Sequence, residues 1–180
     1  MLFDQSNKLV GCYLREKGLT NLQAVDAEAE LSVEVQTHTA LHVLKGAVVK
    51  VLGAKWTAGV YVEGSHGRLT VQFERKPTDE ELILVEQEAN RKIVENASIE
   101  EIELDRAEAE RQWGDAIYDL FPLPTSITRL WILHISGWNV NACNKAHVKT
   151  TGEIGSLKVT NVRYRNTKQL LEISFDVSLA

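Results

Sequence analysis

The chain has 180 residues, of which 44% are hydrophobic and 25% are charged, and its formal net charge is −5. This composition excludes a disordered chain and is typical of one globular domain. No apolar run reaches the roughly 20 residues that a membrane-spanning helix needs, and two cysteines are too few for a disulfide framework. With no recognisable secretory signal, the chain is expected to work in the reducing cytoplasm, without a membrane partner.

The hydrophobic pattern predicts helices and strands that do not alternate strictly along the chain. Residues 1–30 show no clear pattern, and we interpret them as an N-terminal extension of uncertain structure before a domain over residues 31–180. The expected strands lie at residues 31–36, 56–64, 68–74, 99–104, 127–136, 154–165 and 170–179, and the expected helices at residues 38–52, 77–96 and 105–113. The glycines of GSHG, Gly64 and Gly67, predict a hairpin turn. This order predicts an α+β fold, with a mostly antiparallel sheet and packed helices.

Local signals predict where the first two helices begin and end. Thr37 is expected to cap the N-terminus of the first helix, and Gly53 its C-terminus. Thr78, followed three residues later by Glu81, is typical of a capping box at the start of the second helix. Gly46 lies inside the first helix, where it costs stability, and its presence there suggests that another residue packs closely against it.

The charges are unevenly distributed. Residues 79–110 contain twelve acidic and three basic residues, whereas residues 137–170 contain six basic residues and one acidic residue. Each run has a simple interpretation as a solvated face. The sharper interpretation is a dipolar surface whose basic end, including Lys145 and Lys149, meets an RNA backbone. DNA is not an expected partner.

Two pairs of residues have the spacing of metal ligands. His38 and His42 are four residues apart, so a helix presents both imidazoles on one face. The metalloprotease pattern HExxH requires a glutamate after its first histidine, and here that residue is Thr39. Cys143 and His147 repeat the four-residue spacing in a polar loop between two predicted strands. Together the four side chains match a tetrahedral zinc site, although each pair alone is a weak signal.

The two segments that contain these pairs resemble a known family. HTALHVLKGAVVKVLGAKWT and WNVNACNKAHVKTTGEIGSLKV are similar to the free-standing alanyl-tRNA editing proteins of the AlaX group, above all its short subgroup. These proteins are related to the editing domains of alanyl-tRNA and threonyl-tRNA synthetases. The wider family usually has CGGTH where this chain has CNKAH, a difference that the short subgroup shares.

The resemblance implies a zinc-dependent hydrolase that removes serine from tRNA(Ala). It places the zinc ligands at His38, His42, Cys143 and His147. It also implies that Thr57 senses the serine hydroxyl and that Asn141 is a polar residue near the amino acid. Lys145 and Lys149 are the expected tRNA contacts. An aminoacyl ester is easier to cleave than a peptide, so a zinc ion can act on it without a neighbouring glutamate base.

Two other functions remain open from the sequence. In one, zinc only stabilises a tRNA-binding module without hydrolytic activity, and in the other the chain is a structural zinc domain of a larger assembly. Thr57 helps to separate them, because an editing pocket requires a hydroxyl at the start of that strand and a structural zinc site does not. The simple alternative for Thr57 is an ordinary β-branched strand residue.

Overall fold

A computed structural model describes the backbone of residues 21–178 and the side chains of residues 32–178. Its helices and strands are, in chain order, α2 (Asn21–Leu52), β1 (Thr57–Glu63), β2 (His66–Gln72), α3 (Asp79–Val94), β3 (Glu100–Asp105), α4 (Arg106–Trp113), η1 (Gly114–Ile117), β4 (Arg129–Ile135), β5 (Asn139–Ala142), η2 (Thr151–Ile154), β6 (Ser156–Arg165), η3 (Asn166–Lys168) and β7 (Leu170–Ser178). The strands form two antiparallel sheets, of order β1-β2-β7-β6 and β3-β4-β5. The predicted α+β class is confirmed. In the described residues, no helix is long and apolar enough to span a bilayer.

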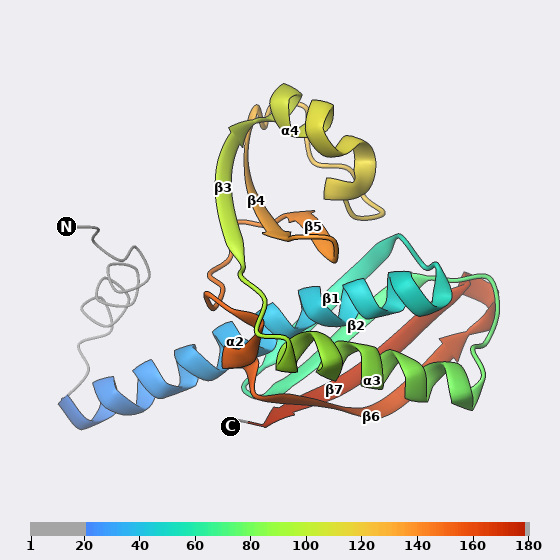
Figure 1. The fold of residues 1–180 in the computed structure, drawn as a ribbon, viewed down its shortest axis with the longest axis horizontal. Helices are drawn as coiled ribbons and strands as arrows, with labels where there is room; N and C mark the ends of the chain where they lie inside the picture. The colour runs from blue at the N-terminus through green and yellow to red at the C-terminus, as the bar shows by residue number, and fades with distance from the viewer. Residues whose placement is uncertain (1–20, 179–180) are drawn as a thin grey trace.

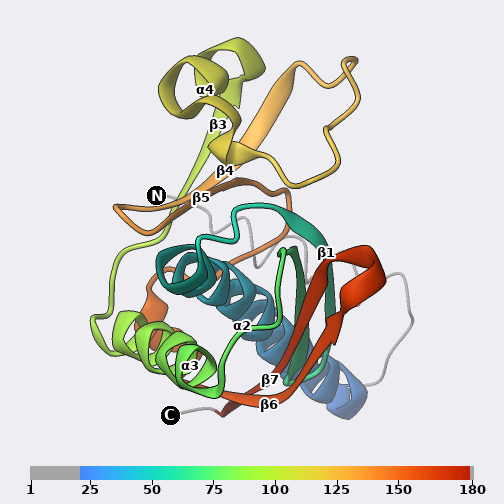
Figure 2. The same ribbon diagram turned by 90° about the vertical axis from the view of Figure 1, so that its right-hand side faces the viewer.

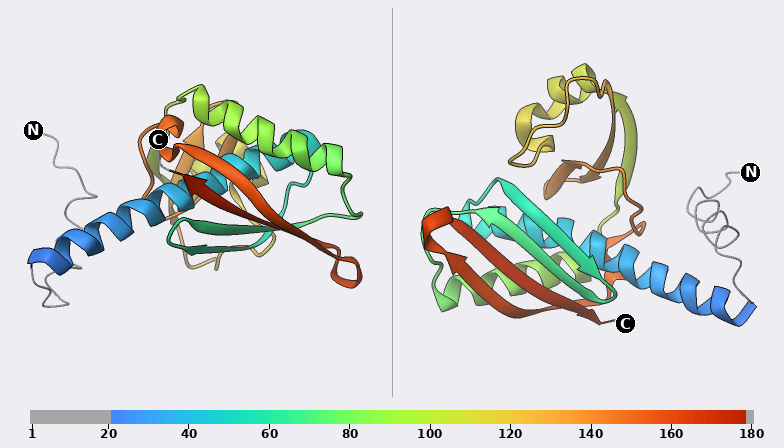
Figure 3. Two further views of the ribbon diagram at one scale, coloured as in Figure 1. Left: turned by 90° about the horizontal axis from the view of Figure 1, so that it is seen from below. Right: turned by 180° about the vertical axis from the view of Figure 1, so that it is seen from behind.

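Helices α2 and α3 cover one face of the four-stranded sheet (Figures 1 and 2). Strand β7 shows why this sheet has one apolar face, since its residues alternate and every second side chain is buried. These side chains, together with the apolar faces of the two helices, form the main hydrophobic core. The view from below in Figure 3 shows both helices on the same side of this sheet.

The three-stranded sheet stands over α2 and has a small core of its own (Figure 1). Strand β4 contributes to both cores because its alternate side chains point to opposite faces. Leu133 and Ile135 are buried in the main core, whereas Leu130 and Ile132 pack with α4 and η1 in the second core. Strand β4 therefore holds the neighbouring strand β5 close to α2.

The predicted strand at residues 31–36 and the predicted N-cap at Thr37 are both wrong, because these residues lie inside α2. Residues 21–30 form the first turns of the same helix, while residues 1–20 lie outside the described residues. The alternating segment LSVEVQ is too short to form a strand when the residues before and after it are helical. The hydroxyl of Thr37 is buried and donates to the carbonyl oxygens of Val33 (2.9 Å) and Gly64 (2.8 Å).

The predicted hairpin and capping box are confirmed, with one exception. Gly64 lies between β1 and β2 with a φ of +54°. Gly67 instead lies within β2, where an added Cβ would be 2.3 Å from the ring of Phe175, so it serves packing rather than the turn. In α3 the Thr78 Oγ1 accepts from the amide of Glu81 (3.2 Å), and the Glu81 carboxylate accepts from the amide of Thr78 (2.9 Å).

The expected close contact at Gly46 is with Trp138. An added Cβ at Gly46 would lie 2.2 Å from the Nε1 of Trp138, and that indole nitrogen donates to the carbonyl oxygen of Val43 (3.0 Å). Trp138 belongs to the loop that joins β4 to β5, and its indole packs directly on the backbone of α2. This contact explains why a residue that weakens helices is found in the middle of α2.

Gly46→Ala should therefore destabilise the protein. Alanine gains about 1 kcal/mol in helix propensity, but displacing a hydrogen-bonded indole costs more, and we expect a net loss of about 1 to 2 kcal/mol in the free energy of unfolding. Urea denaturation measures this loss. Gly59→Ala is the matched control, since its Cβ would meet nothing within 4 Å. Equal stability of the two variants would contradict the packing role of Gly46.

Candidate metal centre

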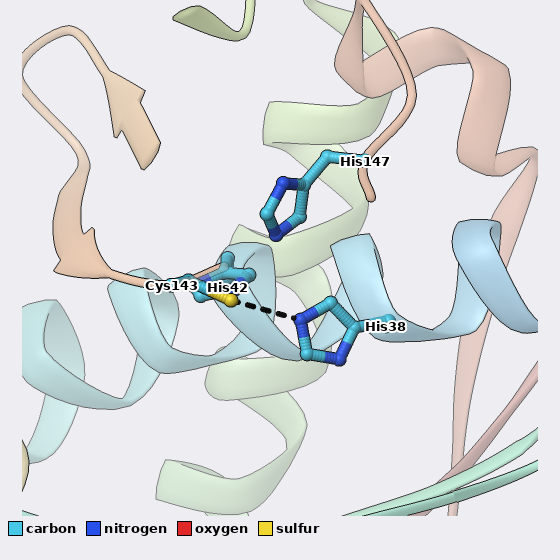
Figure 4. Close-up of side chains that lie close together, drawn as sticks. All are labelled: His38, His42, Cys143 and His147. Atoms are coloured by element: carbon cyan, nitrogen blue, oxygen red, sulfur yellow. Dashed lines mark hydrogen bonds between the residues drawn. The ribbon is translucent and has the colours of Figure 1, made fainter. Parts of the chain in front are cut away.

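The four predicted ligands come together from two separate parts of the chain. His38 and His42 lie on adjacent turns of α2, Cys143 follows the last residue of β5, and His147 lies four residues further along the loop (Figure 4). Their ligand atoms all lie within 4.8 Å of one another. The Nε2 of His38 is 3.3 Å from the Sγ of Cys143. The sequence prediction that these residues form one cluster is confirmed.

Two hydrogen bonds from backbone amides fix the loop, one against β4 and one against α2. The amide of Cys143 donates to the carbonyl oxygen of Trp131 (2.8 Å), which extends the β4–β5 ladder one residue beyond β5. The amide of Val148 donates to the hydroxyl of Thr39 (3.1 Å), and this hydroxyl donates to the carbonyl oxygen of Val35 (2.7 Å). Thr39 therefore joins the two halves of the site from the position that a glutamate occupies in HExxH.

The residues fit a tetrahedral metal ion. Bond lengths of about 2.0–2.3 Å to nitrogen and sulfur require ligand atoms separated by about 3.3–3.8 Å. The 3.3 Å between His38 Nε2 and Cys143 Sγ lies in this range, and all four ligand atoms lie within 4.8 Å of one another. The Nε2 atoms of His42 and His147 are buried and have no hydrogen-bond partner among the described residues. Buried polar atoms without a partner are costly, so two in one cluster indicate a ligand that they share. One thiol and three imidazoles favour zinc among the common metals.

Glu101 of β3 orients the fourth ligand. Its carboxylate accepts a hydrogen bond from the Nδ1 of His147 over 2.7 Å, which directs the Nε2 lone pair of that imidazole toward the cluster. The same hydrogen bond holds the pKa of Glu101 below its usual range. Sequence reasoning missed Glu101, because nothing in a β-strand motif indicates which loop will pack over it.

Burial keeps the helix ligands neutral. Desolvation, followed by repulsion from His147 and Lys145, lowers the pKa of His38 to about 4. Desolvation also lowers the pKa of His42 well below its usual range. Burial raises the pKa of the Cys143 thiol. Both imidazoles therefore offer lone pairs at neutral pH, whereas Cys143 must lose a proton to become a thiolate ligand.

A small pocket, which we call the inner pocket, opens beside the cluster. It holds about 70 Å³ and is lined by His38, Leu41, His42, Lys45, Thr57, Val60, Leu69, Asp119, Asn141, Ala142 and Cys143. Thr57 and Asn141, which the resemblance places near the amino acid, are both buried in its wall. The Oγ1 of Thr57 is buried and has no partner among the described residues. The hydrogen-bonding capacity of this hydroxyl is therefore unused among the described residues.

A buried lysine network forms one end of the inner pocket. The ammonium group of Lys45 donates to the carboxylate of Asp119 and to the side-chain oxygen of Asn141, both over 2.8 Å. The side-chain amide of Asn141 donates to the carbonyl oxygen of Ile117 (3.1 Å), so the network is anchored to η1. Sequence reasoning missed Lys45, although it lies seven residues after His38, on the same face of a helix. No local pattern marked Asp119.

The two lysines predicted to contact tRNA lie at the surface near the cluster. Lys145 is exposed between Cys143 and His147. Lys149 is also exposed, and its ammonium group is 3.8 Å from the Glu101 carboxylate. The structure does not test their contact with RNA, which stays a prediction.

The fold and the cluster together define an α+β domain in which four His and Cys side chains lie as metal ligands would, with a pocket beside them. No protein-family model matches the chain. The chain is similar to alanine–tRNA ligases, with 37% identity over 126 residues to that of Saccharolobus islandicus (69% of this chain, 14% of the ligase) and 37% over 136 residues to that of Methanopyrus kandleri (75% and 14%). It is 35% identical over 147 residues to the ligase of Thermococcus kodakarensis (81% and 16%).

This homology confirms the resemblance that the sequence motifs suggested. The chain is an AlaX-like relative of the editing region of alanyl-tRNA synthetase (alanine–tRNA ligase). It spans only 14% to 16% of the length of these three relatives. The activity of the whole ligases therefore does not transfer to it.

Removing two ligands should abolish metal binding. We expect one metal ion per chain in the wild type and none in the variant with His38→Ala and Cys143→Ala, because two of four donors cannot hold the ion. Elemental analysis after dialysis measures the content. His66→Ala is the control, since His66 lies on β2 and pairs with Asp176 outside the cluster. Stoichiometric metal in the double variant would refute the assignment.

The metal-free protein should lose stability in mild acid. The pKa of His38 falls from 6.5 to about 4 on folding, so the unfolded chain binds more protons between these values. The free energy of unfolding should thus decrease as the pH is lowered from about 6.5 to about 4, by up to about 3 kcal/mol from this residue. Denaturation of chelated protein across this range measures the slope. His38→Gln should reduce the slope and leave the part that His42 contributes, and an unchanged slope would contradict the pKa shift of His38.

Proposed function

We propose that this protein hydrolyses the ester bond between serine and tRNA(Ala), with a zinc ion held by His38, His42, Cys143 and His147. The observation that carries the proposal is the buried, unpartnered hydroxyl of Thr57 in a pocket that reaches the metal ligands. The homology to alanine–tRNA ligases supports tRNA(Ala) as the RNA. We also propose that the protein works in the cytoplasm, where tRNA is charged.

The inner pocket suits a small aminoacyl group. Its volume of about 70 Å³ has no room for a large side chain. Asp119 is the only carboxylate that lines it within the described residues, and it is the natural partner for the α-ammonium group of an aminoacyl ester. Lys45 and Asn141 act through Asp119, because their hydrogen bonds fix its position. Thr57 is left to bind the side-chain hydroxyl of serine.

A bound zinc ion supplies Lewis-acid chemistry, polarising an ester carbonyl and lowering the pKa of a coordinated water to about 7. The protein residues provide position and desolvation around it. His147 is held by Glu101, and the buried side chains of Leu41 and Leu69 form an apolar part of the pocket wall beside the serine side chain. Thr39 has no acidic group, so no carboxylate base follows His38 in the chain. An ester has a better leaving group than an amide, so its hydrolysis is consistent with a site that has no glutamate base at this position.

The alternative of a zinc-stabilised binding module finds less support. A structural zinc site is closed on all sides and needs no pocket beside its ligands. Here His38, His42 and Cys143 all line the inner pocket. The hydroxyl of Thr57 would be an uncompensated cost in a purely structural domain.

Thr57→Val tests the proposed selectivity. The substitution keeps the shape of the side chain and removes the hydroxyl, so hydrolysis of Ser-tRNA(Ala) should slow by about 10- to 100-fold, and discrimination against Ala-tRNA(Ala) should shrink. Deacylation of both substrates, with and without chelator, measures this, and the zinc content should not change. Thr70→Val on β2 is the matched control, since Thr70 does not line the pocket. Wild-type rates on both substrates would place serine recognition elsewhere.

The salt dependence of tRNA binding tests the RNA-facing surface. If Lys145 and Lys149 neutralise phosphates of a duplex stem, the double variant Lys145→Ala, Lys149→Ala should reduce the slope of log affinity against log salt by about 0.9 for each phosphate that is no longer neutralised. Filter binding with a deacylated tRNA(Ala) measures the slope. Lys76→Ala with Lys168→Ala changes the net charge equally at other sites. If charge reversals on α3 weaken binding just as much, the RNA interface has been assigned to the wrong face of the protein.

A further inference from the structure

The segment TGEIG, residues 151–155, follows the loop that carries His147. It includes the short helix η2, which packs against both α2 and α3. Two of its glycines are restricted by their surroundings. Gly155 has a φ of +88°, and an added Cβ at Gly152 would lie 2.3 Å from the side-chain oxygen of Asn96. The segment does not line the inner pocket and holds none of the clustered ligands, so the site itself does not explain these restrictions.

Thr151 joins this segment to the residues that lead from α3 into β3. Its amide donates to the carbonyl oxygen of Ala97 (2.9 Å), and its buried hydroxyl accepts from the amide of Ala97 (2.8 Å). The same hydroxyl donates to the carbonyl oxygen of Lys92 at the end of α3 (2.7 Å). Two residues away, the amide of Ile99 donates to the carbonyl oxygen of Lys149 (2.9 Å). The two segments therefore run antiparallel and are joined at several points.

This antiparallel register continues as far as the metal centre. Ser98 lies opposite Thr150, so three residues further along the first segment and three residues back along the second are Glu101 and His147. These are the two residues whose side chains form the 2.7 Å hydrogen bond. A shift of the register by one residue would replace Glu101 with a neighbour whose side chain points to the other face.

Glu153 holds the same segment from the other end. Its carboxylate accepts from the amide of Lys149 (2.9 Å) and from the amide of Thr150 (2.8 Å). Its carbonyl oxygen accepts from the side-chain amide of Gln36 (3.0 Å), which lies on α2 two residues before His38. One residue thus fixes the backbone after the last ligand and also contacts the helix that carries the first.

We propose that Thr151 and Glu153 are positioning residues for the metal centre, because they set the register that brings Glu101 opposite His147. In this register the Glu101 carboxylate holds the imidazole with its Nε2 toward the other ligands. Partners of this kind, one step beyond the ligands, commonly change metal affinity by about 10- to 100-fold. The inference rests on the metal centre of the proposed function and not on its substrate.

Zinc affinity is the first readout. Glu153→Ala removes the acceptor for two backbone amides, and Thr151→Val removes the buried hydroxyl while keeping the shape of the side chain. Each substitution should raise the Kd for zinc by about 10- to 100-fold. The full chain, stripped of metal, is titrated with zinc in competition with a chromophoric chelator. Glu153→Gln keeps an acceptor oxygen and should restore part of the affinity, which also provides a milder variant.

Glu86→Ala is the matched control. It also removes a carboxylate that accepts from a backbone amide, in this case that of Val159 on β6 (2.8 Å), and it lies on α3 away from the ligands. It should lower the free energy of unfolding and leave the Kd for zinc unchanged. If Glu86→Ala weakens zinc binding as much as Glu153→Ala does, the effect is one of general stability and the inference is wrong.

A double-mutant cycle tests whether Glu153 acts through Glu101. Glu101→Ala alone should weaken zinc binding by a factor similar to that of Glu153→Ala. The variant with both substitutions should bind zinc no more weakly than the weaker single variant, because both remove the same orientation of His147. Fold-changes that multiply in the double variant would show that Glu153 acts independently of Glu101, which overturns the inference.

The ring of His147 gives a readout that general stability does not change. In the metal-free wild type, the ¹⁵N signals of this imidazole should show one tautomer, protonated at Nδ1, because Glu101 accepts the hydrogen bond from that atom. Glu153→Ala should mix the two tautomers at His147 and leave the signals of His66 unchanged. A single wild-type tautomer in the variant contradicts the positioning role.

The zinc titration also separates this inference from the proposed function. A wild type that binds no zinc overturns the metal centre and the positioning role together. A wild type that binds zinc, with variants that keep its Kd, overturns only the positioning role and leaves the proposed function standing.

Discussion

The packing of the three-stranded sheet against α2 is the contact on which the rest of the site depends. The helix carries two ligands, and the segment after β5 carries the other two, so neither part binds a metal alone. The contact is held by Trp138 on Gly46, by the hydroxyl of Thr39 on the amide of Val148, and by the burial of Leu133 in the main core. These interactions are spread over more than one turn of the helix. They hold Cys143 and His147 in place, although both residues belong to a polar loop.

The His and Cys cluster and the Lys45 network, which both line the inner pocket, differ in charge. Burial keeps His38 and His42 neutral, whereas Cys143 must lose a proton to become a thiolate. The buried ammonium group of Lys45 lines the same inner pocket, and Asp119 compensates its charge. A metal ion and a lysine in one small space repel each other, and the carboxylate paired with Lys45 reduces that cost. The arrangement leaves one hydroxyl, that of Thr57, as the uncommitted polar group.

The clustered His and Cys residues could be predicted from the sequence, whereas the residues that hold them in position could not. Paired spacing is a local property, so His38, His42, Cys143 and His147 were all found from it. The alternating patterns located most strands, but not the short strand β5 or the division of the strands into two sheets. Glu101, Lys45 and Asp119 were missed or unmarked, because their roles depend on which distant segment packs beside them. The strand expected at residues 31–36 was wrong for a related reason. Six alternating residues cannot outweigh the cooperativity of a helix that continues through them on both sides.

Strand β4 separates two cores and connects them mechanically. Its Leu130 and Ile132 pack against α4 and η1, while the carbonyl oxygen of Trp131, between them, holds the amide of Cys143. A close-packed strand transmits a displacement on one face to the groups hydrogen-bonded along its edge. The side chain of Ala109 on α4 touches no metal ligand, yet a larger residue there would push on β4 and shift the sulfur of Cys143. The position of Cys143 in the cluster is thus tied to a hydrophobic layer that contains none of the four clustered side chains, so sequence change there can alter the cluster without replacing any of them.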